Sequence, residues 1–227
     1  MSFETICSNI VKILGEYWYI FLVKGVGITL LLSAITVAFG AILGSLFALA
    51  KMSRIPPLRW LVNIIVEVVR GTPILLQLYI GYFIVPQLLP FMEVSDFTSI
   101  AVALVINSAA YVSEIIRSGI QAVDRGQTEA ARSLGLNGGQ TMLRVVLPQA
   151  VKNILPALGN EFVTMIKETS LASTFYIGDL MTSYRAVKGR TYLALECQLI
   201  VGAIYFVLTF TLRKLIGLYE RRLKSHD

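Results

Sequence analysis

Long apolar segments alternate with short polar segments along most of the chain. A bilayer crossing needs roughly 20 mostly apolar residues at a rise of 1.5 Å each, and five segments approach that requirement. They are Val26–Ala50, Leu61–Leu89, Phe97–Ile116, Ile154–Ile177 and Leu195–Leu212. The first carries no charged residue and the fourth is the most polar. The pattern predicts an all-α polytopic membrane protein with five transmembrane helices.

The two ends of the chain differ from this repeating pattern. Residues 1–24 form an amphipathic N-terminal segment that we expect to lie at the membrane interface, with Tyr17, Trp18 and Tyr19 at headgroup level. Residues 25–216 then form the five-helix domain, and residues 217–227 a basic tail. No basic-then-apolar segment with a small-residue cleavage site opens the sequence, so we expect the first span to serve as its own insertion signal.

The distribution of Lys and Arg predicts which side of the membrane each loop occupies. Thirteen of the twenty basic residues fall in 51–59, 117–152 and 213–224, which share one side if there are five spans. Because cytoplasmic loops carry the excess of positive charge, this places the C-terminus in the cytoplasm and the N-terminus outside. The loop at residues 185–190 is an exception. It is basic although this topology places it on the extracytoplasmic side, and the sequence offers no reason for that charge.

Composition supports the membrane class and excludes others. The chain is 56% hydrophobic and 15% charged, with a mean hydropathy of +0.70, which is more apolar than soluble domains usually are. The net charge of +6 fits cytoplasmic loops beside anionic lipid better than nucleic-acid binding. Cys7 and Cys197 show no spacing pattern and are interpreted as ordinary small apolar residues. His226, the single histidine, cannot build a metal site, and we predict none.

The loop between the third and fourth spans has the most distinctive sequence. Gly126 and Gly135 bracket a run of helix-forming residues, Gln127–Leu134. We expect Gly135 to end that helix in the left-handed conformation. A second helical stretch, Gln140–Leu147, is expected to end at Pro148.

The helix expected at Gln127–Leu134, about two turns long, has the features of a mechanical coupling element. The small side chains of Ala130 and Ala131 would permit close contact with a partner, and Glu129 and Arg132 could orient the helix by charge. The alternative is an amphipathic surface helix that only closes a loop. Residue properties alone do not decide between the two.

Small residues in the first span suggest helix packing. Gly40 and Gly44 are separated by three residues, a pattern that lets another helix approach closely. The pattern is common in apolar helices, so a specific packing role is one of two open interpretations.

Ionisable residues inside the spans are costly and are therefore functional candidates. Glu67 and Arg70 are three residues apart, as are Glu114 and Arg117, and each pair could neutralise itself in a structural or gating role. Thr72–Pro73 should break the second span, freeing backbone groups that could line a cavity.

A second group of polar residues has no obvious opposite charge nearby in the sequence. Asn107 lies near the middle of its span and Glu161 early in the polar fourth span. These two side chains could contact a polar substrate. The alternative for Asn107 and Glu161 is hydrogen bonding between helices.

Several ordered motifs resemble one family of permeases. The loop pattern Glu129-Ala-Ala-x3-Gly135, followed by Leu147-Pro148, resembles the EAA signature of ABC-importer permeases, with Val145 where Ile is frequent. Further motifs resemble the polar amino acid permeases of the histidine, glutamine, arginine and cystine type, from about Gly25 to the C-terminus. These are Glu67-Val-Val-Arg-Gly-Thr-Pro73, Asn107-Ser-Ala-Ala-Tyr111, Gly159-Asn-Glu-Phe162 and Lys167-Glu-Thr-Ser-Leu171.

The resemblance implies a type I ABC importer permease fold in the cell (inner) membrane, working as a homo- or heterodimer of permeases. Its partners would be two ATPase subunits, which bind ATP and Mg, and an extracytoplasmic amino-acid-binding protein. The sequence contains no phosphate-binding loop, so we expect no cofactor and no enzymatic activity in this chain. The residues implied to couple it to the ATPase are Gln127, Glu129, Ala130, Ala131, Arg132 and Gly135. With a zwitterionic amino acid as the implied cargo, Glu161 could accept from its ammonium group and Asn107 could bind either end. Thr72 and Lys167 are implied to support the same translocation path.

Three alternatives differ in cargo or class. Opines or another small zwitterion would keep the same machinery, and an ion-coupled carrier or channel would work without ATP. A membrane enzyme has little support, because the sequence lacks a metal cluster and a nucleophile–base set.

Overall fold

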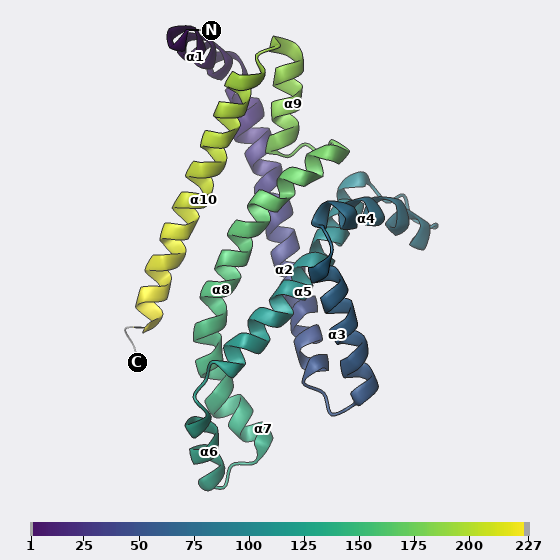
Figure 1. Ribbon diagram of the computed structural model, residues 1–227, viewed down its shortest axis with the longest axis vertical. Helices are drawn as coiled ribbons and strands as arrows, with labels where there is room; N and C mark the ends of the chain where they lie inside the picture. Colours follow the sequence, from purple (N-terminus) through teal and green to yellow (C-terminus); the bar gives the residue numbers. More distant parts are fainter. Residues whose placement is uncertain (1, 225–227) are drawn as a thin grey trace. The chain divides into compact units, whose positions relative to one another are not determined.

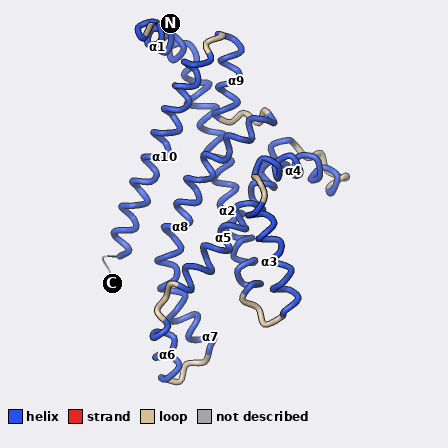
Figure 2. Tube along the Cα trace, in the orientation of Figure 1, coloured by secondary structure: helices blue, strands red, loops and turns tan. Residues whose placement is uncertain are grey.

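The computed structural model describes residues 2–224, and every regular element within them is helical (Figures 1 and 2). The α-helices are α1 (Phe3–Tyr19), α2 (Val26–Lys51), α3 (Pro56–Gly71), α4 (Ile74–Leu88), α5 (Asp96–Gln121), α6 (Arg125–Ser133), α7 (Gly138–Thr141), α8 (Leu147–Glu168), α9 (Leu180–Thr191) and α10 (Ala194–Lys224). Wider π turns occupy Ile20–Gly25 and Met142–Val146, and a 3-10 helix covers Thr169–Phe175. The all-α prediction is confirmed.

The number of crossings stays a prediction. Within the described chain, three continuous helices are long and apolar enough to cross a membrane: Phe3–Lys51, Asp96–Gln121 and Ala194–Arg222. A fourth is added if α3 and α4 together form one broken span. The remaining expected crossing, the fourth segment Ile154–Ile177, corresponds to α8 and the 3-10 helix after it, which are too polar to be recognised from composition.

The predicted break in the second span is confirmed. α3 ends at Gly71 and α4 begins at Ile74, with Thr72 extended between them (φ −116°, ψ 150°). A residue before proline is driven out of the helical region by the proline ring. The Thr72 hydroxyl donates to the Val68 carbonyl at 2.8 Å, which satisfies one of the last acceptors of α3.

The N-terminal segment is helical and continuous with the first span. The Ser2 side chain caps α1, accepting from the Thr5 N–H at 3.3 Å. A π turn at Ile20–Gly25 joins α1 to α2, and Figure 1 shows α1 turned away from the direction in which α2 begins. An inserted residue of this kind is a known cause of helix bends.

The chain forms two compact units, and α2, α5, α8 and α10 each contribute to both. In the first unit, one apolar cluster joins α1, α9 and α10 through Ile13, Val187 and Ile200. A second cluster joins the early part of α2, α4 and the start of α5 through Leu32, Leu78 and Leu104.

The second unit contains the later part of α2, α3, most of α5, α6, α7 and the early part of α8. Val62 and Val66 of α3 pack against Ala110 of α5, with Phe47 of α2 at the edge. Figure 1 shows α3 beside the end of α2.

Gly40 and Gly44 have the packing role suggested by their spacing. A Cβ at Gly44 would lie 2.7 Å from the Ala109 carbonyl oxygen, and one at Gly40 would lie 2.9 Å from Ser108 Oγ. Side chains at these two positions would therefore collide with α5. The glycines let α2 and α5 pack with their backbones close together.

Two segments differ from the boundaries expected from sequence. The basic segment 185–190, expected to be a loop, lies inside α9, whose Asp179 cap and buried Val187 anchor it to the first unit. The tail expected from residue 217 is helical, because α10 continues to Lys224. Its last three residues, including His226, lie outside the described part of the chain.

Candidate functional site

The helix at the centre of the EAA-like loop is α6. The Asp124 side chain caps it by accepting from the Gly126 N–H at 2.7 Å. The expectation that Gly126 precedes the helix is therefore wrong, because the cap places Gly126 in the first turn. α6 spans nine residues, or about two and a half turns.

Gly135 ends α6 as predicted. Its φ of +84° is in the left-handed region, which glycine adopts without a Cβ clash. The Gly135 N–H donates to the Arg132 carbonyl at 3.0 Å, and the Leu136 N–H donates to the Ala131 carbonyl at 3.2 Å. These two bonds form a Schellman motif, which fixes the direction in which the chain leaves α6.

The second helical stretch does not end at Pro148. Asn137 and Gln140 form a reciprocal capping box that starts α7, and the backbone stays helical from α7 through the π turn into α8. Proline lacks an N–H and crowds the carbonyl four residues earlier. Here that carbonyl belongs to Arg144, inside the wider π turn at Met142–Val146, so the helix continues past Pro148.

α6 exposes most of the residues expected to couple to the ATPase. The side chains exposed to solvent are Gln127, Glu129, Ala130, Arg132 and Leu134. Leu134 is 82% exposed, a large apolar side chain at the helix end. Ala131 is buried at 5% exposure, so its small size serves packing within this chain and not contact with a partner.

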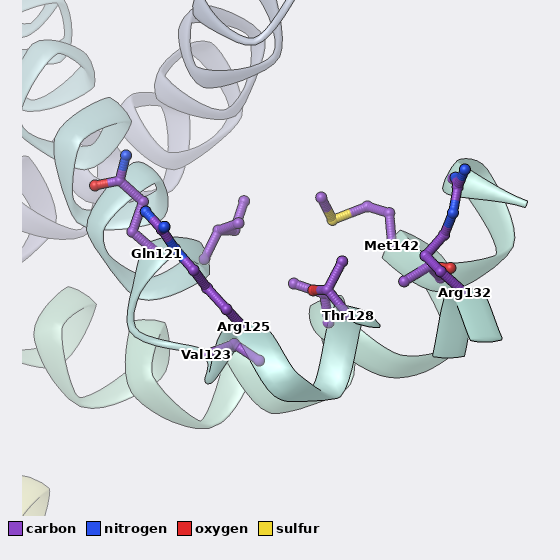
Figure 3. A pocket seen from close by; sticks show the side chains of 10 residues that line it. Gln121, Val123, Arg125, Thr128, Arg132 and Met142 are labelled. Atoms are coloured by element: carbon purple, nitrogen blue, oxygen red, sulfur yellow. The ribbon is translucent and has the colours of Figure 1, made fainter. Parts of the chain in front are cut away.

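A hollow of about 610 Å³ lies beside α6, between it, the end of α5 and the α7 region. Figure 3 shows the Arg125 side chain extending toward Gln121, with Thr128 and Met142 facing the same space. Arg132 lines its other end near Gly138, where a Cβ would lie 3.2 Å from Arg132 Nη1. Arg125 and Arg132 make this concave surface basic.

Three basic side chains converge on Glu114 of α5. Arg117 Nε and Nη2 donate to Glu114 Oε2 at 3.0 and 2.7 Å, which confirms the predicted pair. Lys51, at the end of α2, donates to Glu114 Oε1. Lys51 and Glu114 are largely buried, with side chains 12% and 16% exposed. The contact therefore fixes the end of α2 against α5.

The predicted pair between Glu67 and Arg70 is not formed in the described structure. Arg70 Nη1 lies 3.9 Å from Glu114 Oε2, and its guanidinium stacks over the Tyr111 ring at 5.4 Å. Val66 of α3 packs on α5, and Arg70 follows it by one helical turn, which brings Arg70 to α5. Glu67 is exposed.

A groove of about 610 Å³ adjoins the charge cluster. Arg70 and Arg117 line it from one side and Asn153 of α8 from the other. Three cations surround one carboxylate, so the cluster carries a net charge of +2.

Asn107 and Glu161 are both buried, at 3% and 7% exposure. The Ser108 hydroxyl donates to Glu161 Oε1 at 3.0 Å, which links α5 to α8. Asn107 precedes this serine in the chain. Both candidates from the sequence are thus buried in the second unit, and Glu161 is bonded by the residue that follows Asn107.

The other two candidates for the translocation path lie elsewhere. Thr72 bonds its own helix end, as described above, and Lys167 is exposed near the end of α8. Lys167 belongs to the first unit, whereas Asn107 and Glu161 belong to the second.

Three contributors to these sites were missed from sequence. Lys51 was counted only as a loop charge, and Ser108 and Tyr111 were noted only within a motif. A signal for Lys51 exists, because α2 and α5 both end on the proposed cytoplasmic side. Ser108 and Tyr111 depend on which faces of the helices meet, which the sequence pattern does not give.

The chain matches the family described as "Binding-protein-dependent transport system inner membrane component" over residues 18–225. It is 44% identical over 207 residues to the arginine transport system permease protein ArtQ of Bacillus subtilis (strain 168), covering 91% of this chain and 94% of that protein. It is 39% identical over 204 residues to the putative glutamine transport system permease protein GlnP of Rickettsia bellii (strain RML369-C), covering 90% and 93%.

The fold is similar to that of a solved transporter. A crystal structure of an amino acid ABC transporter with histidines superposes with a TM-score of 0.87 and 46% identity. The superposition covers 92% of this chain and 96% of that one.

Proposed function

The chain belongs to the binding-protein-dependent inner membrane component family as the permease subunit of an amino acid ABC importer, and we propose that α6 couples it to the ATPase. The exposed surface of α6 is the observation that carries this proposal. Gln127, Glu129 and Arg132 are exposed beside Leu134. Because both ends of α6 are capped, the helix can move as a rigid unit when the ATPase moves, and it passes that movement to the rest of the permease.

We propose the topology given by the basic residues, with the N-terminus outside and α6 in the cytoplasm. α8 is then a crossing despite its polarity, because residues facing a translocation path need not be apolar. ATPase closure would shift two paired permeases between inward-facing and outward-facing packings. The pairing, with an identical or a second permease chain, is part of the proposal.

The proposed cargo is a polar amino acid, in keeping with the arginine and glutamine named for the similar permeases. Glu161 would accept hydrogen bonds from the cargo's ammonium group or a cationic side chain. Asn107 would assist from α5, and the Glu114 cluster would hold the ends of α2 and α5 in a structural or gating role. ATP and Mg would be bound by the partner ATPase.

Charge reversal on α6 tests the coupling role. Glu129→Arg should weaken co-purification of the ATPase and reduce ATP-driven uptake at an unchanged permease level. Glu93→Arg, at an exposed position outside α6, is the matched control. If Glu129→Arg keeps both ATPase association and uptake at wild-type levels, the coupling role of α6 is wrong.

A further inference from the structure

Helix α9 presents a basic surface that the transport role described so far does not use. Leu180, Ser183 and Val187 are buried and anchor the helix. Lys188 and Arg190 are exposed. The one carboxylate at the start of the helix, Asp179, is fully buried and serves as the N-cap, with its oxygens accepting from the first turn.

The cations of α9 are not neutralised by ion pairs. Arg185 stacks over the Tyr176 ring at 5.5 Å and Lys188 over the Tyr184 ring at 5.7 Å. Within residues 2–224, no carboxylate lies within salt-bridge distance of Arg185, Lys188 or Arg190. α9 therefore carries three positive charges, with Arg185 and Lys188 on one face of the helix and Arg190 near its C-terminal end.

A tyrosine in the left-handed conformation stands at each end of α9. Tyr176 has φ 54° and Tyr192 has φ 59°, a region that side chains with a Cβ seldom occupy. Their side chains are 70% and 88% exposed. Each residue ends a helix, because the Tyr176 N–H donates to the Ser173 carbonyl at 3.2 Å and the Tyr192 N–H donates to the Lys188 carbonyl at 2.8 Å. The backbone is thus used within this chain, while most of both side chains stays exposed.

The charges and the two exposed tyrosines together indicate an interface. Tyrosine and arginine are the residues that most often dominate binding energy in protein interfaces. In the proposed topology α9 lies on the outer side of the membrane. Lys and Arg are usually concentrated on the cytoplasmic side, so basic residues on α9 need another explanation. Binding-protein dependence of the family requires an outer surface for that protein.

We propose that Tyr176, Arg185, Lys188, Arg190 and Tyr192, the α9 surface, dock an acidic patch of the extracytoplasmic binding protein. This rests on the proposed topology. The cations would speed association by long-range attraction, and the two tyrosines would supply contact area with few rotatable bonds.

Uptake by the complete transporter in proteoliposomes, measured against binding-protein concentration, tests the charge part. Lys188→Glu with Arg190→Glu should raise the half-saturating binding-protein concentration roughly 10-fold and leave maximal uptake unchanged. The matched control is Lys12→Glu, an exposed lysine placed on the same side. Raising salt should weaken wild-type docking more than docking of the double variant.

Tyr192→Gly separates docking from folding. Glycine relieves the strain at φ 59°, so the thermal midpoint should stay equal or rise, while the half-saturating concentration should also rise. If the charge variant and Tyr192→Gly both leave that concentration unchanged, or Lys12→Glu raises it equally, the docking proposal is wrong. If the effect of the charge variant depends on anionic lipid in the vesicles and not on the binding-protein concentration, the surface binds lipid headgroups. That result would overturn the docking proposal.

Labelling distinguishes a failed topology from a failed docking surface. In a variant lacking Cys7 and Cys197, Lys188→Cys should react with an impermeant maleimide from the outside and Glu129→Cys only from the inside. The reverse pattern would reject the topology. Outside labelling of Lys188→Cys combined with unaltered docking of the charge variant would reject the α9 surface alone.

Discussion

The Ser108 hydroxyl donates a hydrogen bond to Glu161 Oε1 across 3.0 Å, joining α5 to α8. The same serine contacts α2, because a Cβ at Gly40 would lie 2.9 Å from its Oγ and Cβ. Three helices therefore meet around the carboxylate proposed to bind cargo. Since a buried carboxylate is unfavourable without partners, this contact helps to hold Glu161 in place.

Glu161→Gln tests the cargo role of that carboxylate. Glutamine keeps an acceptor for Ser108 and removes the charge that would bind an ammonium group. Because hydrogen bonds to charged groups contribute more than neutral ones, we expect the uptake KM to rise about 10-fold or more, with unchanged permease level. Ser108→Ala, which leaves the charge, should raise KM by less. Wild-type kinetics in Glu161→Gln would remove Glu161 from the site.

Lys51→Met tests the charge cluster on Glu114. Arg117 still pairs with the carboxylate, so the loss is that of one charged hydrogen bond, roughly 1.5–3 kcal/mol, or a thermal midpoint several degrees lower. Differential scanning fluorimetry in detergent measures it. Adding Glu114→Gln should restore part of the loss, because the less compensated charge is then gone. Lys12→Met, at an exposed position in α1, is the control. Equal thermal midpoints for Lys51→Met and wild type would show that the Lys51–Glu114 pair does not contribute to stability.

Gly44→Ala tests the close packing of α2 and α5. The added methyl would lie 2.7 Å from the Ala109 carbonyl oxygen and 2.8 Å from Val112 Cβ. Overpacking of this kind costs about 1–3 kcal/mol, so the thermal midpoint should fall. Gly27→Ala, on the same helix with open space around it, should be neutral or slightly stabilising. A midpoint that falls equally in both variants would speak against the packing argument.

Gly135→Ala tests the helix stop in the coupling loop. Alanine at φ +84° is strained by roughly 1–2 kcal/mol, so the last turn of α6 should open more often. Hydrogen exchange at the Gly135 and Leu136 amides would report this as faster exchange. Gly139→Ala, where φ is ordinary and the nearest atom is 3.5 Å away, should exchange as wild type does. Unchanged exchange in Gly135→Ala would mean that the motif does not hold the loop.

The sequence predicted features that depend on local chemistry. The predicted span Val26–Ala50 agrees with α2 to within one residue at each end. An uncharged apolar segment of this length is stable in a membrane chiefly as a helix. The left-handed stop at Gly135 and the break at Thr72–Pro73 follow from backbone sterics of single residues.

Features that depend on neighbours were predicted less well. Arg70 was paired with Glu67 by spacing, but the packing of Val66 carries it to Glu114 and Tyr111. Pro148 was expected to stop a helix, and a π turn four residues earlier accommodates it. Ala131 was expected to face a partner and is buried in its own chain. In each case the outcome depends on contacts with residues distant in sequence or on a helix irregularity that has no strong sequence signal.

Coupling of transport to ATP hydrolysis can be measured as uptake by proteoliposomes. The permease would be reconstituted with its ATPase, with binding protein and labelled amino acid outside. We expect uptake that requires ATP on the ATPase side, stops with vanadate, and falls strongly in Glu129→Arg while Glu93→Arg transports normally. Uptake that continues without ATP and follows an imposed ion gradient would contradict this expectation.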